Sequence, residues 1–213
     1  MRLLHIDSSI LGEASASRQL SAAVVRALTR AMPDLEIIRR DLDADPIPHL
    51  DSRSLAAVRR GIAGNAAHDA DEKSAAALDE FLGADIVVIG APMYNFAIPS
   101  QLKAWLDRIV IAGKTFRYSE AGVQGLAGDK KVIIAASRGG LYGPGTPQEA
   151  YDFQERYLRA ILGFIGVADI EIVRAEGLAY GPEQREAAIL TALASVSSVV
   201  ARVGAGVGVR EAA

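Results

Sequence analysis

The sequence predicts an α/β fold, namely a doubly wound sheet of five parallel strands in the order 2-1-3-4-5 with helices on both of its faces. Short runs rich in β-branched residues recur along the chain, and stretches with helical periodicity separate them. Strands that are apolar throughout are buried on both sides, which is typical of parallel sheets covered by helices. The length of 213 residues suits one domain with a sizeable core.

Each expected element has a local signal. Short apolar runs predict strands at residues 3–6, 86–89, 132–136 and 170–173, and the more polar segment 36–41 is expected to be the second strand. A helix is expected after Ser17, because Leu20, Val24 and Leu28 recur on one face, and further helices are expected at about 98–110, 147–164 and 182–203. Two long loops, 43–70 and 115–129, depart from a minimal fold, and long loops are often functional. Residues 1–203 form the predicted single domain, and 204–213 are expected to be a disordered tail.

Composition excludes several classes of protein. The formal net charge of -3 gives no support for binding to nucleic acid or to an anionic membrane surface. The absence of cysteine excludes disulfides and thiolate catalysis, and His5, His49 and His68 are too far apart in sequence to suggest a metal site. The chain runs straight into a strand, and no charge-free apolar run reaches the ~18 to 20 residues of a membrane span. We therefore expect a cytoplasmic protein without a signal peptide.

The loop between the first strand and the first helix suits a phosphate. It holds four serines, among them Ser9, Ser15 and Ser17, and it ends at a helix N-terminus. The free N–H groups and the positive dipole end of a helix favour an anion at this position. A simple serine cap at Ser17 is the alternative, but it does not account for the clustering of hydroxyl groups.

The loops after the third and fourth strands suit a flat aromatic ligand. Met93, Tyr94 and Phe96 offer broad polarizable surfaces, and the Asn95 amide both donates and accepts hydrogen bonds. The loop after the fourth strand contains two glycines, which let the backbone approach a ligand closely; its sequence is Ser137-Arg138-Gly139-Gly140. In the predicted strand order all three loops meet at the carboxyl edge of the sheet, around one crevice. Together they predict a mononucleotide site for a flavin.

Two competing enzyme classes are excluded by missing residues. A serine hydrolase with Asp7-Ser8 at the end of the first strand needs a histidine base, and no histidine follows His68. Gly113-Lys114-Thr115 matches the end of a P-loop, but Arg108 stands where the first glycine is required. A flavodoxin-type electron carrier or flavin-sensing module stays open as the alternative. The weak net charge and the 115–129 insertion favour an enzyme over such a carrier.

In these loops and in further segments, the chain resembles the FMN-dependent NADH azoreductases, which belong with the NAD(P)H:quinone reductases of flavodoxin-like fold. The most specific motifs are the two loop sequences, Met93-Tyr94-Asn95-Phe96 and Ser137-Arg138-Gly139-Gly140. Further matching segments extend over nearly the whole chain, and they include Ser15-Ala16-Ser17, Pro46-Ile47-Pro48, Gln101-Leu102-Lys103 and Leu162-Gly163-Phe164-Ile165-Gly166.

The resemblance implies a flavodoxin-like fold and a bound FMN. The FMN phosphate and ribityl end would be held by Ser9, Ser15, Ala16 and Ser17, with Ala16 acting through its backbone. The ring would be held by Met93, Tyr94, Asn95, Phe96, Ser137, Arg138, Gly139 and Gly140. NADH or NADPH would deliver electrons, and quinones or azo compounds would then receive them at the same place in a ping-pong reaction. The cofactor would carry the chemistry, so no protein acid or base is expected to be essential.

The resemblance also implies a homodimer with the active site at the subunit interface. Phe116, Tyr118 and Phe164 would roof the flavin and sandwich the acceptor, and Arg59 would meet the phosphates of the nicotinamide nucleotide. Local packing of these aromatic rings under their own loop is the alternative, since most aromatic side chains are buried.

Overall fold

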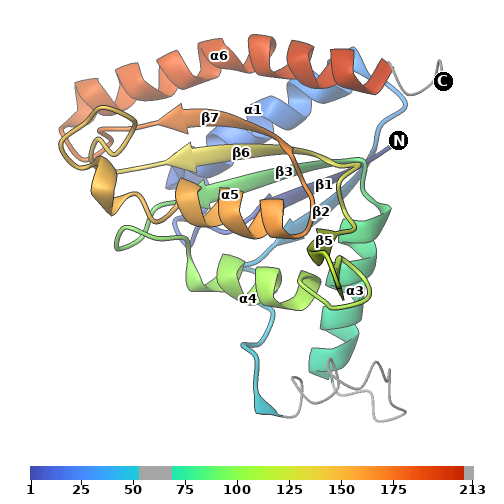
Figure 1. Cartoon of the computed structure of the whole chain (residues 1–213). Coiled ribbons are helices and arrows are strands. Elements are labelled where there is room, and N and C mark those ends of the chain that lie inside the picture. Colours follow the sequence, from blue (N-terminus) through green and yellow to red (C-terminus); the bar gives the residue numbers. More distant parts are fainter. Residues whose placement is uncertain (53–68, 209–213) are drawn as a thin grey trace.

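A five-stranded parallel sheet forms the centre of the molecule (Figure 1). The computed structural model describes residues 1–52 and 69–208. The strand order is β2-β1-β3-β6-β7, which confirms the predicted order of five parallel strands. These strands are β1 (Arg2–Asp7), β2 (Glu36–Asp41), β3 (Ile86–Pro92), β6 (Lys131–Ser137) and β7 (Asp169–Ala175).

Helices cover both faces of the sheet (Figure 1). Successive strand residues point to opposite faces, and in β1, β3 and β6 both sets of side chains are mostly apolar, so both faces are buried. Leu3 packs into the core beneath α1 (Ala16–Ala31) and α6 (Pro182–Gly208). The next residue, Leu4, packs into the opposite core beneath α3 (Asp69–Gly83), α4 (Ser100–Ile109) and α5 (Glu155–Phe164). In this second core the rings of Phe81 and Trp105 meet edge to face at 5.9 Å.

Three helix boundaries differ from their predicted positions. Ser15 rather than Ser17 caps α1, because the Ser15 hydroxyl accepts the Arg18 N–H. The helix expected at about 147–164 begins only at Glu155, after a short 3-10 turn, η2 (Glu149–Tyr151). One Asp152 carboxylate oxygen accepts the N–H groups of Gln154, the N-cap residue, and of Glu155, the first residue of α5, and so stabilises the start of this helix. At the other end of the chain, α6 runs on to Gly208, beyond the expected end at Val203.

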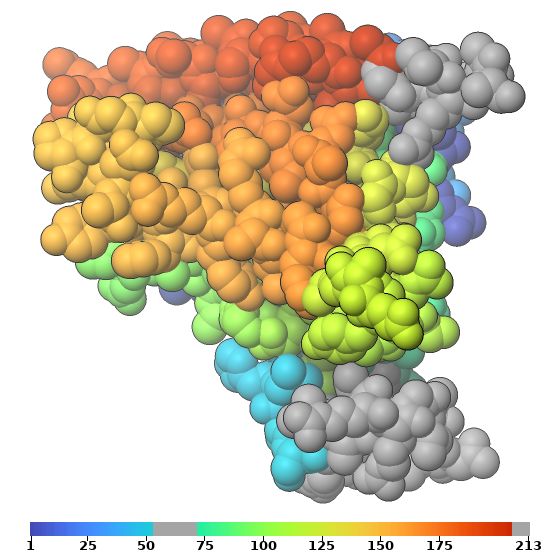
Figure 2. Space-filling model, in the orientation of Figure 1, coloured from blue at the N-terminus to red at the C-terminus, as the bar shows by residue number. Residues whose placement is uncertain are grey.

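The 115–129 insertion forms an antiparallel hairpin that the sequence did not predict. Its strands are β4 (Phe116–Ser119) and β5 (Gly122–Gly125). The hairpin lies at the amino-terminal edge of the sheet, because Ala127 donates to Ile165 just after α5 and the chain then enters β6. Figure 2 shows one face of the molecule, with the yellow-green hairpin at one end and the yellow-orange segment that follows β6 at the other end.

Helix α6 is apolar over most of its length. By length and composition the stretch Pro182–Ala205 could cross a membrane, with a mean hydropathy of 1.7. The sequence predicts no membrane span, and that prediction did not identify this stretch as a candidate. Its Val196, Val199 and Val203 side chains are buried in the core that it shares with α1. A helix that covers a core has the same composition, so the apolar stretch is weak evidence for a membrane.

Candidate functional site

The three loops that the sequence predicts to meet lie side by side at the carboxyl edge of the sheet. The register pairs Pro92 with Ser137, so the ends of β3 and β6 are level, and it pairs Asp7 with Gly90, so β1 ends two residues earlier. Two hydrogen bonds join the loops directly. The Ser8 hydroxyl donates to the Gly90 carbonyl at 2.7 Å, and the Met93 N–H donates to the Ser137 carbonyl at 2.8 Å. The predicted meeting of these loops at the carboxyl edge is therefore confirmed.

The serines of the first loop form a buried group of hydroxyls at the start of α1. Ser9, Ser15 and Ser17 are all buried, and the Ser15 and Ser17 hydroxyls share a hydrogen bond of 3.1 Å. Ser9 shares a second hydrogen bond of 3.1 Å with the Tyr94 hydroxyl. The first N–H groups of a helix have no partner within the helix, and here they lie beside these hydroxyls. We call this group of three serines at the start of α1 the serine cradle; its donors suit an anion.

A cation supports the cradle from behind, and the sequence analysis gave it no role. The Arg18 guanidinium donates to the Ser9 carbonyl at 2.8 Å and forms a two-pronged pair with Asp41 at 2.6 and 2.7 Å. This guanidinium lowers the pKa of Asp41 to about 2. Asp7, at the end of β1, accepts the Ser21 hydroxyl at 2.8 Å and so ties α1 to the sheet. The start of α1 is thus held by charge as well as by packing.

The loop after β3 is held in an unusual backbone conformation. Asn95 and Phe96 have φ angles of 49° and 71°, in the left-handed region that residues other than glycine adopt uncommonly. Reciprocal backbone hydrogen bonds between Tyr94 and Ala97 close this tight turn. The turn leaves the Phe96 ring 45% exposed, beside the rings of Tyr142 and Tyr151 at 6.0 and 5.4 Å. Non-glycine strain of this kind gathers at ligand sites, where the surroundings fix it.

The Arg138 side chain does not extend toward the crevice. It is 0% exposed, and it points into a cluster of acidic side chains instead. Ser137 is also buried, whereas Gly139 is exposed at the rim. Of the predicted Ser137–Gly140 set, Arg138 is therefore placed behind the site.

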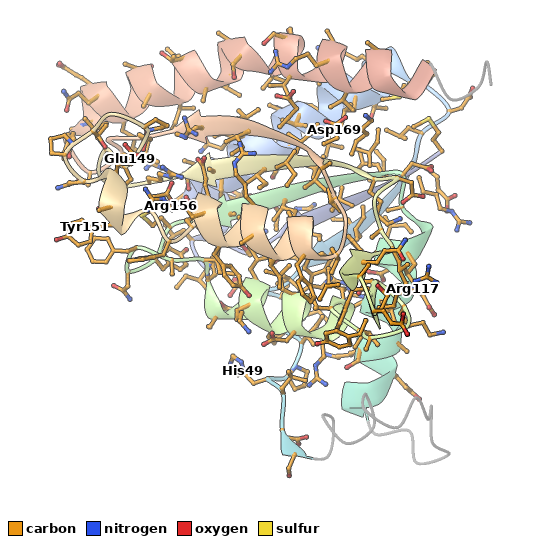
Figure 3. The ribbon with its side chains drawn as sticks, viewed as in Figure 1. His49, Arg117, Glu149, Tyr151, Arg156 and Asp169 are labelled. Atoms are coloured by element: carbon orange, nitrogen blue, oxygen red, sulfur yellow. The ribbon has the colours of Figure 1, made fainter. Side chains whose placement is uncertain are left out.

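The predicted acceptor-binding residues do not join this site within one chain. Phe116 is buried with its ring 4.7 Å from that of Phe164, which matches the local-packing alternative for these two rings. Tyr118 is 74% exposed on the hairpin, at the opposite edge of the sheet. Arg59 lies outside the described residues. Figure 3 shows the same separation, with Arg117 of the hairpin at one end of the molecule and Tyr151 at the other.

Several aromatic residues near the crevice escaped the sequence analysis. Tyr142, Tyr151 and Phe153 come from the segment after β6, and the Phe153 N–H donates to the Phe96 carbonyl at 3.1 Å. Beside this segment lies a hollow of about 520 Å³, lined by Ala97, Lys103, Phe153, Arg156 and Tyr157. Arg156 approaches Glu149 to 3.5 Å, near Tyr151 (Figure 3). The tyrosine and phenylalanine residues gathered after residue 141 are the sequence feature that could have predicted this aromatic rim.

Taken together, the site offers an anion-binding cradle and a rim of exposed aromatic rings. The buried serine hydroxyls and the α1 N-terminus fit a phosphate, and the strained Asn95–Phe96 turn with its neighbouring rings fits a planar group. The arrangement can therefore bind and orient a ligand that is anionic at one end and flat at the other.

Comparison with known proteins adds a family and close relatives. Residues 1–200 match the family described as "Flavodoxin-like fold". A protein of Methylocella silvestris named "FMN-dependent NADH:quinone oxidoreductase" is 59% identical over 191 residues, which cover 89% of this chain and 94% of that protein. A second relative, "FMN-dependent NADH:quinone oxidoreductase 2" of Bradyrhizobium diazoefficiens, is 54% identical over 201 residues, covering 94% of this chain and all 100% of that protein.

The fold of the chain also matches solved structures of azoreductases. An azoreductase from Bacillus anthracis matches with a TM-score of 0.83 at 29% identity, covering 94% of this chain and 98% of that chain. An FMN-dependent NADH-azoreductase from Bacillus anthracis, solved in complex with FMN, matches with a TM-score of 0.83 at 26% identity, covering 95% and 99% of the two chains.

Proposed function

The chain belongs to the flavodoxin-like fold family and, within it, to the FMN-dependent NADH:quinone oxidoreductases, and from this premise we propose how it works. The protein is an oxidoreductase that uses FMN and NADH. It transfers electrons from NADH or NADPH to quinones and aromatic azo compounds in a ping-pong reaction, in which donor and acceptor occupy the same place in turn. A cytoplasmic location stays a prediction from the cysteine-free composition.

The serine cradle is the observation that carries this proposal. Three buried hydroxyls lie at a helix N-terminus, and the Arg18–Asp41 pair fixes the backbone behind them. A terminal phosphate accepts hydrogen bonds from such donors and is favoured by the positive end of the helix dipole, whereas an uncharged ligand gains little from that dipole. One phosphate fits FMN.

The protein's own residues bind and orient the cofactor. Bound FMN supplies the electron transfer, and its reactivity belongs to the cofactor itself. Ser9, Ser15, Ala16 and Ser17 hold the phosphate and the ribityl chain, Ala16 through its backbone N–H. Met93–Phe96 and the rim formed by Ser137, Gly139 and Gly140 hold the ring, and N–H groups at this rim stabilise negative charge on it. No protein acid or base is required to be essential.

The position of the hairpin supports a homodimer. Tyr118 and Phe164 lie at the amino-terminal edge of the sheet, and the cofactor loops lie at the carboxyl edge. These aromatic residues therefore reach a flavin only if a second copy supplies them. An exposed Tyr118 beside partly exposed Phe164 suits such a contact, since interfaces are rich in aromatic residues.

Titration of the flavin-free protein with FMN tests the proposal. We expect one FMN per chain, and we expect NADH to bleach the bound flavin without a partner protein and a quinone to restore its colour. Ser17→Ala removes one charge-facing hydroxyl without removing the cap, so its FMN affinity should fall about tenfold, since such hydrogen bonds are worth ~1.5 to 3 kcal/mol. Ser198→Ala, an exposed serine on α6, is the matched control and should bind FMN like the wild type.

Two results would contradict the proposal. Binding of FAD in preference to FMN would argue against a single-phosphate cradle. Slow bleaching by NADH that becomes fast only with a partner protein would favour a flavodoxin-type electron carrier.

A further inference from the structure

Arg138 is the most completely enclosed charge among the described residues near the site, and it has four side-chain partners. Its guanidinium reaches Asp152 at 3.0 Å, Glu155 at 2.5 Å and Glu176 at 3.1 Å. Its Nε donates to the Gln154 side-chain oxygen at 2.8 Å. We call these five residues the Arg138 cluster. Arg174 adds a second guanidinium at its edge, paired with Glu155 at 2.7 Å.

Each partner of Arg138 belongs to a different part of the site's frame. Gln154 donates its amide to the Ala91 carbonyl at 2.7 Å, near the end of β3. Asp152 starts α5 by accepting two backbone N–H groups. Glu176 follows β7, and the carboxylate oxygen that meets Arg138 also accepts the Tyr142 N–H at 2.7 Å. One buried guanidinium therefore joins the ends of β3, β6 and β7 and the start of α5.

The cluster also bears on the strained turn after β3. Phe96 holds a φ angle of 71°, which persists only where its surroundings fix it. Those surroundings include the Tyr142 and Tyr151 rings and the Phe153 N–H, besides the backbone bonds that close the turn. Glu176 fixes the backbone of Tyr142, and Asp152 is the chain neighbour of Phe153. The Arg138 cluster thus supports two of the contacts around Phe96, those with Tyr142 and Phe153.

We propose that Arg138 and Glu176 are positioning residues that preorganise the ring-binding rim, and that neither touches the cofactor. This inference rests on the proposed function, because it assigns them to the FMN ring. A buried ion pair adds little net stability, since desolvation offsets much of its attraction. Its hydrogen bonds do, however, fix the direction of each group. The cluster should therefore matter more for the shape of the rim than its contribution to folding would suggest.

Variants of Glu176 separate positioning from stability. Glu176→Ala removes the acceptor for the Tyr142 N–H, and we expect the Kd for FMN to rise about tenfold or more and the circular dichroism of the bound flavin to change. Glu176→Gln keeps an oxygen acceptor, so it should bind FMN within about threefold of the wild type and restore the flavin spectrum. Arg138→Lys keeps the positive charge but loses the planar guanidinium that donates to several partners at once. Its Kd for FMN and its flavin spectrum should therefore change as in Glu176→Ala.

Glu80→Ala is the matched control. Glu80 forms a two-pronged pair with Arg40 of β2 at 2.7 Å, at the opposite edge of the sheet from β7 and Glu176, and its side chain is 22% exposed against 17% for Glu176. This variant should lower the melting temperature and leave the Kd for FMN unchanged. All titrations are run well below the melting temperature of each variant.

The outcomes are distinct. Wild-type protein that does not bind FMN overturns the proposed function itself. Wild-type protein that binds FMN, with Glu176→Ala and Arg138→Lys both showing its Kd and its flavin spectrum, overturns the positioning role alone.

Discussion

At the scale of single residues, the pair of Arg18 and Asp41 links the site to the stability of the fold. The guanidinium holds the Asp41 pKa at about 2, below the ordinary value of 3.8. Because the folded-state pKa is the lower one, the pair stabilises the fold above pH 3.8 and loses its contribution as the pH falls toward 2. The shift corresponds to about 2 kcal/mol of unfolding free energy.

Asp41→Asn should therefore lower the unfolding free energy by about 2 kcal/mol at pH 7, and its difference from wild type should shrink steadily as the pH falls. Urea unfolding at a series of pH values between neutral and acid measures this. The exposed Asp34→Asn serves as the control and should follow the wild-type pH profile. A constant deficit for Asp41→Asn at every pH would show that its ionisation is not the cause.

At the scale of elements, the β4–β5 hairpin is held by a contact between two glycines. A Cβ atom at Gly125 would lie 2.2 Å from the Gly166 nitrogen, so no side chain fits unless the backbone moves. Gly125→Ala should cost about 1 to 3 kcal/mol of unfolding free energy. Gly163→Ala, inside α5 and with open space around it, should instead be neutral or stabilising by up to about 1 kcal/mol. Thermal unfolding of both variants decides this, and equal stability for Gly125→Ala and wild type would refute the close contact.

Elements with local signals were predicted correctly, and those without were not. The strand order and the meeting of the three loops follow from apolar runs and from the rule that ligands bind at the carboxyl edge. The hairpin was missed because its strands are only four residues each, too short for the alternation of Phe-Arg-Tyr-Ser in β4 to predict a strand, and β5 begins and ends with glycine. The placement of Arg138 was also missed, because its partners Asp152 and Glu176 lie 14 and 38 residues along the chain. Only the fold brings those charges together.

At the scale of the whole molecule, the two surfaces proposed to build the active site lie at opposite edges of the sheet. The cofactor loops occupy the carboxyl edge of the sheet, and the hairpin with Tyr118 occupies the amino-terminal edge (Figure 1). We propose that a symmetric pair of chains resolves this separation, because a two-fold axis would let each hairpin cover the other chain's cofactor loops. Such a dimer would contain two identical sites, each built from both subunits.

This arrangement predicts the behaviour of Tyr118→Ala. Loss of one ring above the flavin should raise the KM for a quinone by roughly two- to tenfold, since an aromatic contact is worth ~0.5 to 1.5 kcal/mol. FMN should stay bound, because the serine cradle belongs to the other face of the site. Leu190→Ala removes another exposed apolar side chain, 59% exposed on α6 against 74% for Tyr118, and should leave the KM unchanged. Sedimentation should show a dimer at assay concentrations, whereas a fully active monomer with a kinetically silent Tyr118→Ala would place the complete site within one chain.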